Sequence, residues 1–244
     1  MNKRLSIVKI GGALLESPGE LSAFCRAFAG LPDPKILVHG GGQRASALSR
    51  RLGHEPLMVG GRRITDDKAL EVALMVYAGW ANKTLVASLQ AQDCPALGLS
   101  GADAGWAGDI KKVDGKRLGQ LLGLGLVPVL CALTHDGKGQ MLNTNADTIA
   151  AAVAAAMRTE ADCTLMYCFD KPGVLTDVRD EGSLLKTLDR DTCERMWEDG
   201  RIAAGMLPKL HNGFRALEEG VQRVLLGAPA MLRPGADRYT ELKP

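Results

Sequence analysis

The feature that most constrains the fold is a regular alternation of short apolar runs with helical patterns along most of the chain. The apolar runs lie at residues 5–10, 35–39, 95–99, 127–133, 163–169 and 221–226. Helices are expected to begin between these runs near Ser17, Gly41, Asp66, Asp114, Asn145, Asp189 and Pro208. Uniformly apolar strands are typical of a parallel sheet that helices cover on both faces. We therefore expect an α/β fold with a largely parallel sheet.

Local signals refine this outline at three places. Ser17 and Glu20 have the spacing of a capping box, and the proline between them suits the first helical position. Residues 56–65 are predicted to form a hairpin that turns at Gly60-Gly61, and residues 133–143 a second hairpin that turns at Asp136-Gly137. No linker divides the chain, so residues 1–244 are expected to form a single domain.

Composition excludes several classes of protein. Lys plus Arg number 30 against 28 Asp plus Glu, and aromatic residues make up only 4%, so nucleic acid is not an expected partner. No apolar run approaches the roughly 20 residues of a membrane span, and the start has no signal-peptide pattern. The six cysteines lack zinc-site spacing, which predicts free, mostly buried thiols in a reducing cytoplasm.

Two glycine clusters follow the first two strands. Gly11-Gly12 and Gly40-Gly41-Gly42 would lie at the carboxyl ends of parallel strands, where ligands bind in such sheets. Their exposed backbone N–H groups could bind phosphate oxygens. The chain has no P-loop motif, and the G-x-G-x-x-A match at 40–45 lacks the acidic residue of a dinucleotide site. A role in tight turns alone stays open.

Two lysines stand where an unpaired ammonium is unfavourable. Lys9 lies near the end of an apolar strand, and Lys209 lies in the first turn of a helix, where its charge opposes the dipole. Both positions suggest a bound anion, although a solvated Lys209 remains the alternative. Asp147, in the first turn of an alanine-rich helix, could hold both lysines in position. Asn143 or Asn145 could cap that helix, and Asn143 could instead bind a substrate.

The remaining polar residues suggest chemistry without a general base. One arginine of the pair Arg62-Arg63 could grip a carboxylate with two hydrogen bonds, while the other is solvated. No Ser-His-Asp set or H-E-x-x-H motif occurs, and the histidines show no ligand spacing. Phosphoryl transfer needs mainly positioning and charge stabilisation. A carboxylate acceptor, with a reference pKa of about 4.3, is already ionised near neutral pH.

Six motifs in order carry a resemblance to a known family. They are VKIGG (8–12), VHGGG (38–42), GGRRIT (60–65), MLNTNADT (141–148), FDKPGVL (169–175) and GMLPK (205–209). From about residue 5 to 226 the chain resembles the amino-acid kinase family. The motifs look most like those of the acetylglutamate kinases, which phosphorylate the side-chain carboxylate of an N-acylated glutamate in arginine biosynthesis. The resemblance implies a three-layer αβα sandwich around a mainly parallel sheet.

The resemblance also implies roles for single residues. Lys9 and Lys209 would stabilise the transferring phosphoryl group, Asp147 would organise them, and Gly11 and Gly12 would contact the phosphate. The residues that would bind the acylated amino acid are Gly41, Gly42, Arg63 and Asn143. The residues that would contact the nucleotide are Asp170, Lys171, Gly173, Val174, Arg201, Ile202 and Ala203.

The implied partners are ATP and an N-acyl-glutamate. The acyl amino acid would bind a lobe of roughly residues 1–160 and the nucleotide a lobe of 161–244. Mg²⁺ would come with ATP, held by phosphate oxygens rather than by a protein metal site. The chain lacks the N-terminal helical extension of similar arginine-inhibited hexamers, which predicts a homodimer. The segment 98–114 is shorter than in relatives, which usually carry a β-hairpin there, and the end lacks their glycine-threonine finish.

Several alternatives stay open. The acyl group could be acetyl or succinyl. Within the same family, aminoadipate, aspartate, carbamate and isoprenoid phosphate are other acceptors. A nucleotide or amino-acid sensor without activity would bind ATP without turnover. A dinucleotide-dependent oxidoreductase would use residues 40–45.

Overall fold

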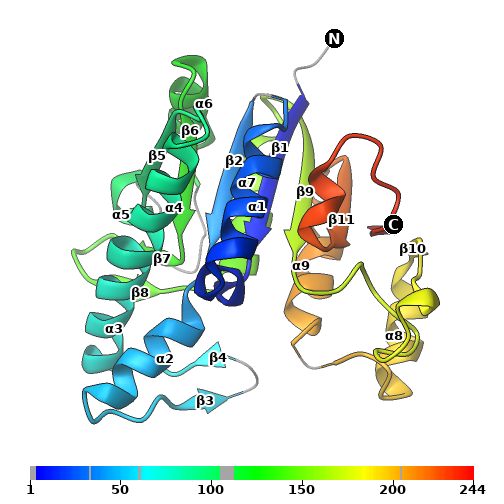
Figure 1. Ribbon diagram of the computed structural model, residues 1–244, viewed down its shortest axis with the longest axis horizontal. Helices are drawn as coiled ribbons and strands as arrows, with labels where there is room; N and C mark the ends of the chain where they lie inside the picture. Colours follow the sequence, from blue (N-terminus) through cyan, green and yellow to red (C-terminus); the bar gives the residue numbers. More distant parts are fainter. Residues whose placement is uncertain (1–3, 33, 60–61, 105–112, 204) are drawn as a thin grey trace.

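The central element is an eight-stranded sheet with the order β10-β12-β11-β9-β1-β2-β6-β5 (Figure 1). The structure, a computed structural model, describes residues 4–32, 34–59, 62–104, 113–203 and 205–244. The strands are β1 (Arg4–Ile10), β2 (Lys35–His39), β5 (Ala96–Leu99), β6 (Val127–Cys131), β9 (Asp162–Cys168), β10 (Thr187–Leu188), β11 (Arg223–Gly227) and β12 (Thr240–Leu242). Within this sheet all described pairings are parallel except that of β11 with β12. The six predicted strands and the mainly parallel sheet are confirmed.

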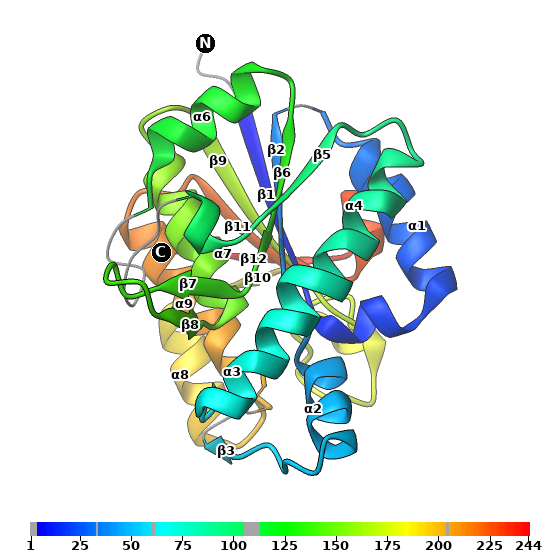
Figure 2. The same ribbon diagram turned by 90° about the vertical axis from the view of Figure 1, so that its left-hand side faces the viewer.

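Helices cover both faces of the sheet, as Figures 1 and 2 show from two sides. One face carries α1 (Pro18–Ala29), α4 (Asn82–Gln90) and the short η4 (Pro229–Leu232). The other carries α6 (Gly115–Gly123), α7 (Ala146–Met157), α8 (Arg190–Glu198) and α9 (Leu207–Glu218). Shorter segments are η1 (Gly12–Glu16), α5 (Gly101–Ala104) and η3 (Glu181–Ser183). The predicted three-layer αβα sandwich is confirmed.

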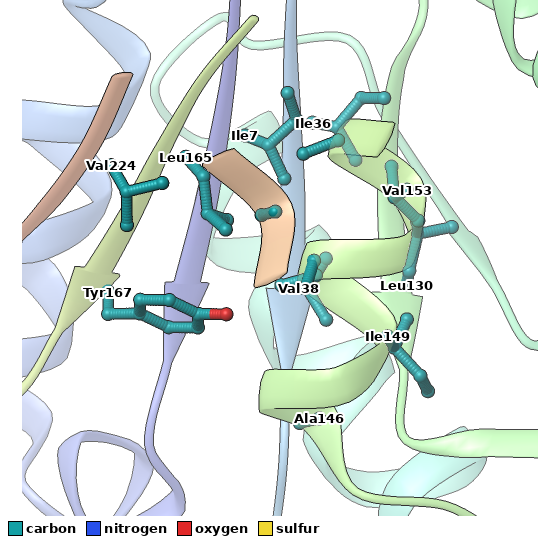
Figure 3. Close-up of a cluster of buried hydrophobic side chains, with 14 of the residues drawn as sticks. Ile7, Ile36, Val38, Leu130, Ala146, Ile149, Val153, Leu165, Tyr167 and Val224 are labelled. Carbon is teal, nitrogen blue, oxygen red and sulfur yellow. The ribbon is translucent and has the colours of Figure 1, made fainter. Parts of the chain in front are cut away.

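Alternation along each strand decides which helical layer a side chain meets. Ile7 and Leu165 belong to the core cluster on the side of α7, which Figure 3 shows in close-up. Val8 and Leu37 belong to the second cluster, on the side of α1 and α4. By the same alternation, Lys9 shares the face of Ile7, so its side chain is directed toward α7.

The helix starts follow the sequence signals with one exception. Asp66, Asp114, Asn145 and Asp189 each cap a helix through a side-chain oxygen that accepts a backbone N–H. The capping box at Ser17 is wrong, because the Ser17 side chain makes no cap hydrogen bond within the described chain. The backbone closes that turn instead, since Leu21 N donates to Ser17 O at 2.9 Å.

Both predicted hairpins are confirmed. β3 (Met58–Val59) pairs with β4 (Arg62–Arg63), and their turn at 60–61 lies outside the described residues. β7 (Leu133–His135) pairs with β8 (Met141–Asn143). In the second turn Asp136 Oδ1 accepts hydrogen bonds from Lys138 N and Gln140 N, which fixes the loop. The middle of the segment expected to be short, 98–114, lies outside the described residues, because 105–112 are not described.

One long helix links the two core clusters. α2 (Gly42–Arg51) contacts it, and it runs as α3 (Asp67–Ala73), the π-helical η2 (Leu74–Ala81) and α4 without a break. By length and composition alone this 24-residue helix could cross a membrane, contrary to the expectation that no apolar run is long enough. Here it is a core helix: Val76 packs in the cluster beside α7, and Leu85 packs in the cluster beside α1.

All six cysteines are buried, reduced thiols, as predicted. Burial raises the pKa of the Cys131 thiol to about 12, so it stays protonated and packs as a small apolar side chain.

Truncation of the sheet core should measure how much this packing contributes. Leu165 is fully buried in β9, so Leu165→Ala should lower the free energy of unfolding by about 2–5 kcal/mol. Leu124 is 75% exposed, and Leu124→Ala should change it by less than about 0.5 kcal/mol. Urea denaturation of both variants provides the comparison, and equal losses would contradict the assigned core.

Candidate active site

Two lysines that are 200 residues apart in sequence meet at one buried carboxylate. Lys9 Nζ lies 2.7 Å from Asp147 Oδ1, and Lys209 Nζ lies 3.4 Å from Asp147 Oδ2. The side chains of Lys9 and Asp147 are each only 7% exposed, and that of Lys209 15%. Asp147 Oδ1 has no well-directed hydrogen bond from a described residue, so its contact with Lys9 is an ion pair set by charge. The structure thus brings together the three residues on which the sequence prediction depends.

Each member is fixed by its own element. Lys9 lies in β1, on the face that α7 covers. Asn145, rather than Asn143, caps α7 and accepts from the backbone N–H groups of Asp147 and Thr148. Because Asn145 accepts from these N–H groups, the Asp147 side chain is not needed as a cap, and its carboxylate faces the lysines. In the close-up of Figure 3 the Tyr167 hydroxyl points toward α7, and it donates to the Asp147 backbone carbonyl at 3.0 Å.

The electrostatics of the three residues favour a bound anion. Burial by itself would raise the pKa of Asp147, but Lys9 and Lys209 outweigh this and hold it below its ordinary value. Burial, and then the charge of Lys9, lowers the pKa of Lys209, which the charges of Asp147 and Asp170 partly offset. With both lysines protonated, the group carries one excess positive charge in a buried place. A phosphate oxygen would neutralise it.

The two glycine loops lie against each other beside this group. Gly12 begins η1, and a Cβ on it would lie 3.1 Å from Gly41 Cα. A Cβ on Gly41 would lie only 2.7 Å from the Tyr77 ring. Close packing inside the protein therefore explains these two glycines. A Cβ on Gly11 would meet no described atom within 4 Å, so a ligand has room there.

The side chains expected to bind the acyl amino acid gather where α2 begins. Arg63 Nη2 donates to Gly42 O at 3.0 Å and to Ser46 Oγ at 2.7 Å. Asn143 Nδ2 donates to Thr65 Oγ1 at 2.9 Å, which links the two hairpins. The predicted residues of this set thus come from one neighbourhood, and their contact with a substrate stays a prediction.

The residues expected to contact the nucleotide are divided between surface and core. Asp170 is exposed and acts on Lys209 through its charge. Arg201 and Ala203 are exposed, and Lys171 is half-buried.

The other predicted nucleotide contacts, Gly173, Val174 and Ile202, are buried. Val174 N donates to Thr240 Oγ1 at 2.8 Å. A Cβ on Gly173 would lie 2.5 Å from the same Thr240 oxygen. Thr240 of β12 therefore packs against Gly173 and Val174, and their contact with a nucleotide stays a prediction.

Three further residues support the site although no sequence signal marked them. Tyr77, Thr65 and Tyr167 contact Gly41, Asn143 and Asp147 respectively. Each lies in an apolar or short polar run that local patterns cannot distinguish from ordinary core or turn.

The donor set suits phosphate rather than a metal held by the protein. Within the described ranges, no three His, Cys, Asp or Glu side chains gather to hold an ion. Asp147 is already paired with two lysines. Ammonium groups and backbone N–H groups are donors for phosphate oxygens, so the residues fit a nucleotide phosphate and the Mg²⁺ that such a phosphate carries.

Removal of the shared carboxylate should be visible in the titration of Lys209. The Lys209 amine should titrate below the ordinary 10.5, because burial and Lys9 disfavour its charged form. In Asp147→Asn its pKa should fall further, since the Asp147 charge raises it. The pH dependence of acylation at Lys209, followed by mass spectrometry with exposed Lys116 as internal reference, measures this. An unchanged or raised midpoint in the variant would contradict the arrangement.

Comparison with known proteins agrees with this geometry. Residues 4–227 match the amino acid kinase family. The acetylglutamate kinase of Cytophaga hutchinsonii is 45% identical over 240 residues, 92% of this chain and 91% of that protein. That of Bacteroides thetaiotaomicron is 44% identical over 241 residues, 93% of this chain and 94% of that protein.

Among solved structures, the N-acetylglutamate synthase from Neisseria gonorrhoeae complexed with coenzyme A and N-acetyl-glutamate is similar with a TM-score of 0.82. It is 23% identical, and the match covers 98% of this chain and 59% of that chain. This likeness concerns the fold alone. The sequence matches go further: the chain belongs to the amino acid kinase family and lies, by sequence, among its acetylglutamate kinases.

Proposed function

We propose that the protein transfers the γ-phosphoryl group of ATP to the side-chain carboxylate of an N-acyl-L-glutamate in arginine biosynthesis. The acyl group is acetyl or, as the alternative, succinyl. The observation that carries this proposal is the buried group of Lys9, Asp147 and Lys209 beside two glycine loops. The identity of 45% to an acetylglutamate kinase over nearly the whole chain supports the choice of acceptor.

The chemistry requires charge stabilisation rather than proton removal. An oxygen of the acceptor carboxylate attacks the γ-phosphorus, and the bond from that phosphorus to the bridging oxygen breaks. ADP leaves with the electron pair of that bond, and an acyl phosphate forms. Lys9 and Lys209 stabilise the negative charge on the moving group and on the leaving oxygen. Asp147 acts as a positioning residue, because its two oxygens are occupied by the lysines.

The two substrates belong to different parts of the single domain. The acyl amino acid is assigned to roughly residues 1–160, where Arg63, Asn143 and the Gly40–Gly42 loop lie together. The nucleotide is assigned to 161–244, with Asp170 and Lys171 at the end of β9. Mg²⁺ bound to ATP would neutralise phosphate charge there. A cytoplasmic homodimer that arginine does not inhibit completes the proposal.

A panel of carboxylate acceptors tests the reaction. With Mg²⁺ and ATP, the enzyme should convert N-acetyl- or N-succinyl-glutamate to an acyl phosphate that hydroxylamine traps as the hydroxamate. N-acyl-aminoadipate, aspartate and carbamate should react far more slowly. Binding of ATP without product from any acceptor would favour a sensor, and tight binding of NAD(P)H would favour an oxidoreductase.

Loss of one lysine should abolish most of the turnover without unfolding the chain. Lys9→Ala removes a charge that would stabilise the transferring group, so kcat should fall by about 10²–10³-fold. Lys116→Ala, an exposed change on α6, should leave kcat unchanged. Steady-state kinetics on both variants, with circular dichroism to verify folding, gives the answer. Near-normal turnover of Lys9→Ala would remove Lys9 from the mechanism.

A further inference from the structure

A buried polar network lies behind the Gly40–Gly42 loop, on the face of the sheet opposite Lys9. His39, the last residue of β2, is fully buried. Its Nδ1 lies 2.8 Å from Gly40 O, and its Nε2 lies 3.1 Å from Asn82 Nδ2. Asn82, the first residue of α4, also donates from Nδ2 to Val129 O at 2.9 Å. The network therefore links α4, β6 and β2 to the loop.

The direction of every hydrogen bond in this network is determined. Val129 O can only accept, so the Asn82 atom facing it must be the amide nitrogen. That nitrogen then donates to His39 Nε2, which must be the unprotonated ring atom. His39 Nδ1 consequently carries the proton and donates to Gly40 O. Burial lowers the pKa of His39 to about 4, so the ring is neutral near neutral pH, as this pattern requires.

The position of the Asn82 side chain depends on a glycine in the neighbouring strand. A Cβ on Gly98 in β5 would lie 1.9 Å from Asn82 Oδ1, so only glycine leaves room there. Asn82 Oδ1 in turn accepts from Lys83 Nζ at 3.2 Å. Both nitrogen atoms of His39 and both polar atoms of Asn82 are thus satisfied. A fully satisfied buried network holds one geometry.

The π-helical segment lets the same helix contact the loop at a second point. In an α-helix, residues five apart lie about 140° apart around the axis, so Tyr77 and Asn82 would face different ways. In a π-helix the hydrogen bonds run from residue i to i+5, so residues five apart lie on nearly the same face. η2 covers 74–81 and places Tyr77 against Gly41 while Asn82 acts on Gly40 through His39.

This arrangement determines where one backbone N–H points. Gly40 C=O and Gly41 N–H belong to the same planar peptide unit and point in opposite directions. The hydrogen bond from His39 to Gly40 O therefore directs the Gly41 N–H away from His39. Gly41 is buried, and among the described residues its N–H has no hydrogen-bond acceptor. A buried donor without a partner in the protein is suited to an oxygen of a bound substrate.

We propose that the π-helical segment and His39 position the glycine loop for phosphoryl transfer. Asn82 orients His39, His39 fixes the Gly40–Gly41 peptide, and the Tyr77 ring supports Gly41 from the other side. The Gly41 N–H then donates to the acceptor carboxylate or to the moving phosphoryl group. His39, Asn82 and Tyr77 are positioning residues that act through the loop. This inference rests on the proposed function, whose substrates it uses.

Two substitutions at one position separate this role from simple packing. His39→Asn keeps a side-chain N–H near the place of Nδ1 and can still donate to Gly40 O. His39→Gln places its amide near Nε2, beside Asn82, and leaves Gly40 O without a donor. His39→Gln should lower kcat/KM for the acyl-glutamate by about tenfold, the equivalent of one lost hydrogen bond. His39→Asn should stay within about threefold of the wild type.

The control is a partly buried hydrogen bond from a side chain to a backbone carbonyl at the far end of α2. Ser49 Oγ donates to His54 O at 2.6 Å, so Ser49→Ala should lower the melting temperature without changing kcat/KM. ATP affinity should stay within about twofold of the wild type in all three variants, because the nucleotide binds elsewhere. Wild-type kinetics in His39→Gln, or equal losses in His39→Asn and His39→Gln, would overturn the proposal.

Two further measurements keep the test decisive. If His39→Gln does not fold, Tyr77→Leu should show the same tenfold loss with ATP binding retained, and unchanged kinetics would overturn the proposal. If the wild type phosphorylates no acceptor, the proposed function fails separately. Amide hydrogen exchange in the ligand-free protein then tests the network. The backbone N–H of Gly41 should exchange faster in His39→Gln than in Ser49→Ala, because only His39→Gln releases the Gly40–Gly41 peptide unit. Equal exchange would overturn it.

Discussion

The contact of Asp147 with Lys9 and Lys209 is the interaction that the rest of the site depends on. It joins β1, α7 and α9, three elements that are far apart in sequence, through one buried carboxylate. A buried ion pair contributes little net stability, because desolvation of the charges offsets most of their attraction. Two cations on one carboxylate are less favourable still. The excess positive charge of the lysines contributes little to folding. A bound anion that neutralises this charge is therefore the better explanation for it.

Most of the secondary structure could be predicted because its signals are local. The apolar runs, the caps at Asp114 and Asp189 and the turn at Asp136 each depend on residues within a few positions of one another. β10 and β12 escaped prediction because they are two and three residues long. Their pairing is decided by distant partners, such as the ion pair of Arg223 with Glu241 at 3.0 Å.

The site was predictable where burial and charge conflict. Lys9 in an apolar strand is such a conflict, and it predicts a negatively charged partner before any coordinates are known. The glycine loops are different, since one sequence signal has two physical causes. Gly41 leaves space for the Tyr77 ring, whereas Gly11 leaves space that the protein does not fill. Only the packing distances separate the two causes. The burial of Val174 under Thr240 escaped prediction for the same reason.

The long helix from Asp67 to Gln90 shows how the core and the site share one framework. Its α4 part packs on the sheet, while its π-helical part lies against the glycine loop. A π-helical turn is rare because it packs its backbone less well than an α-helix does, so it persists where the surrounding contacts require its register. Here that register lets Tyr77 and Asn82 act on adjacent glycines. The likeness to an N-acetylglutamate synthase concerns this framework alone. The proposed reaction depends on residues such as Lys9 and Asp147, which the framework brings together.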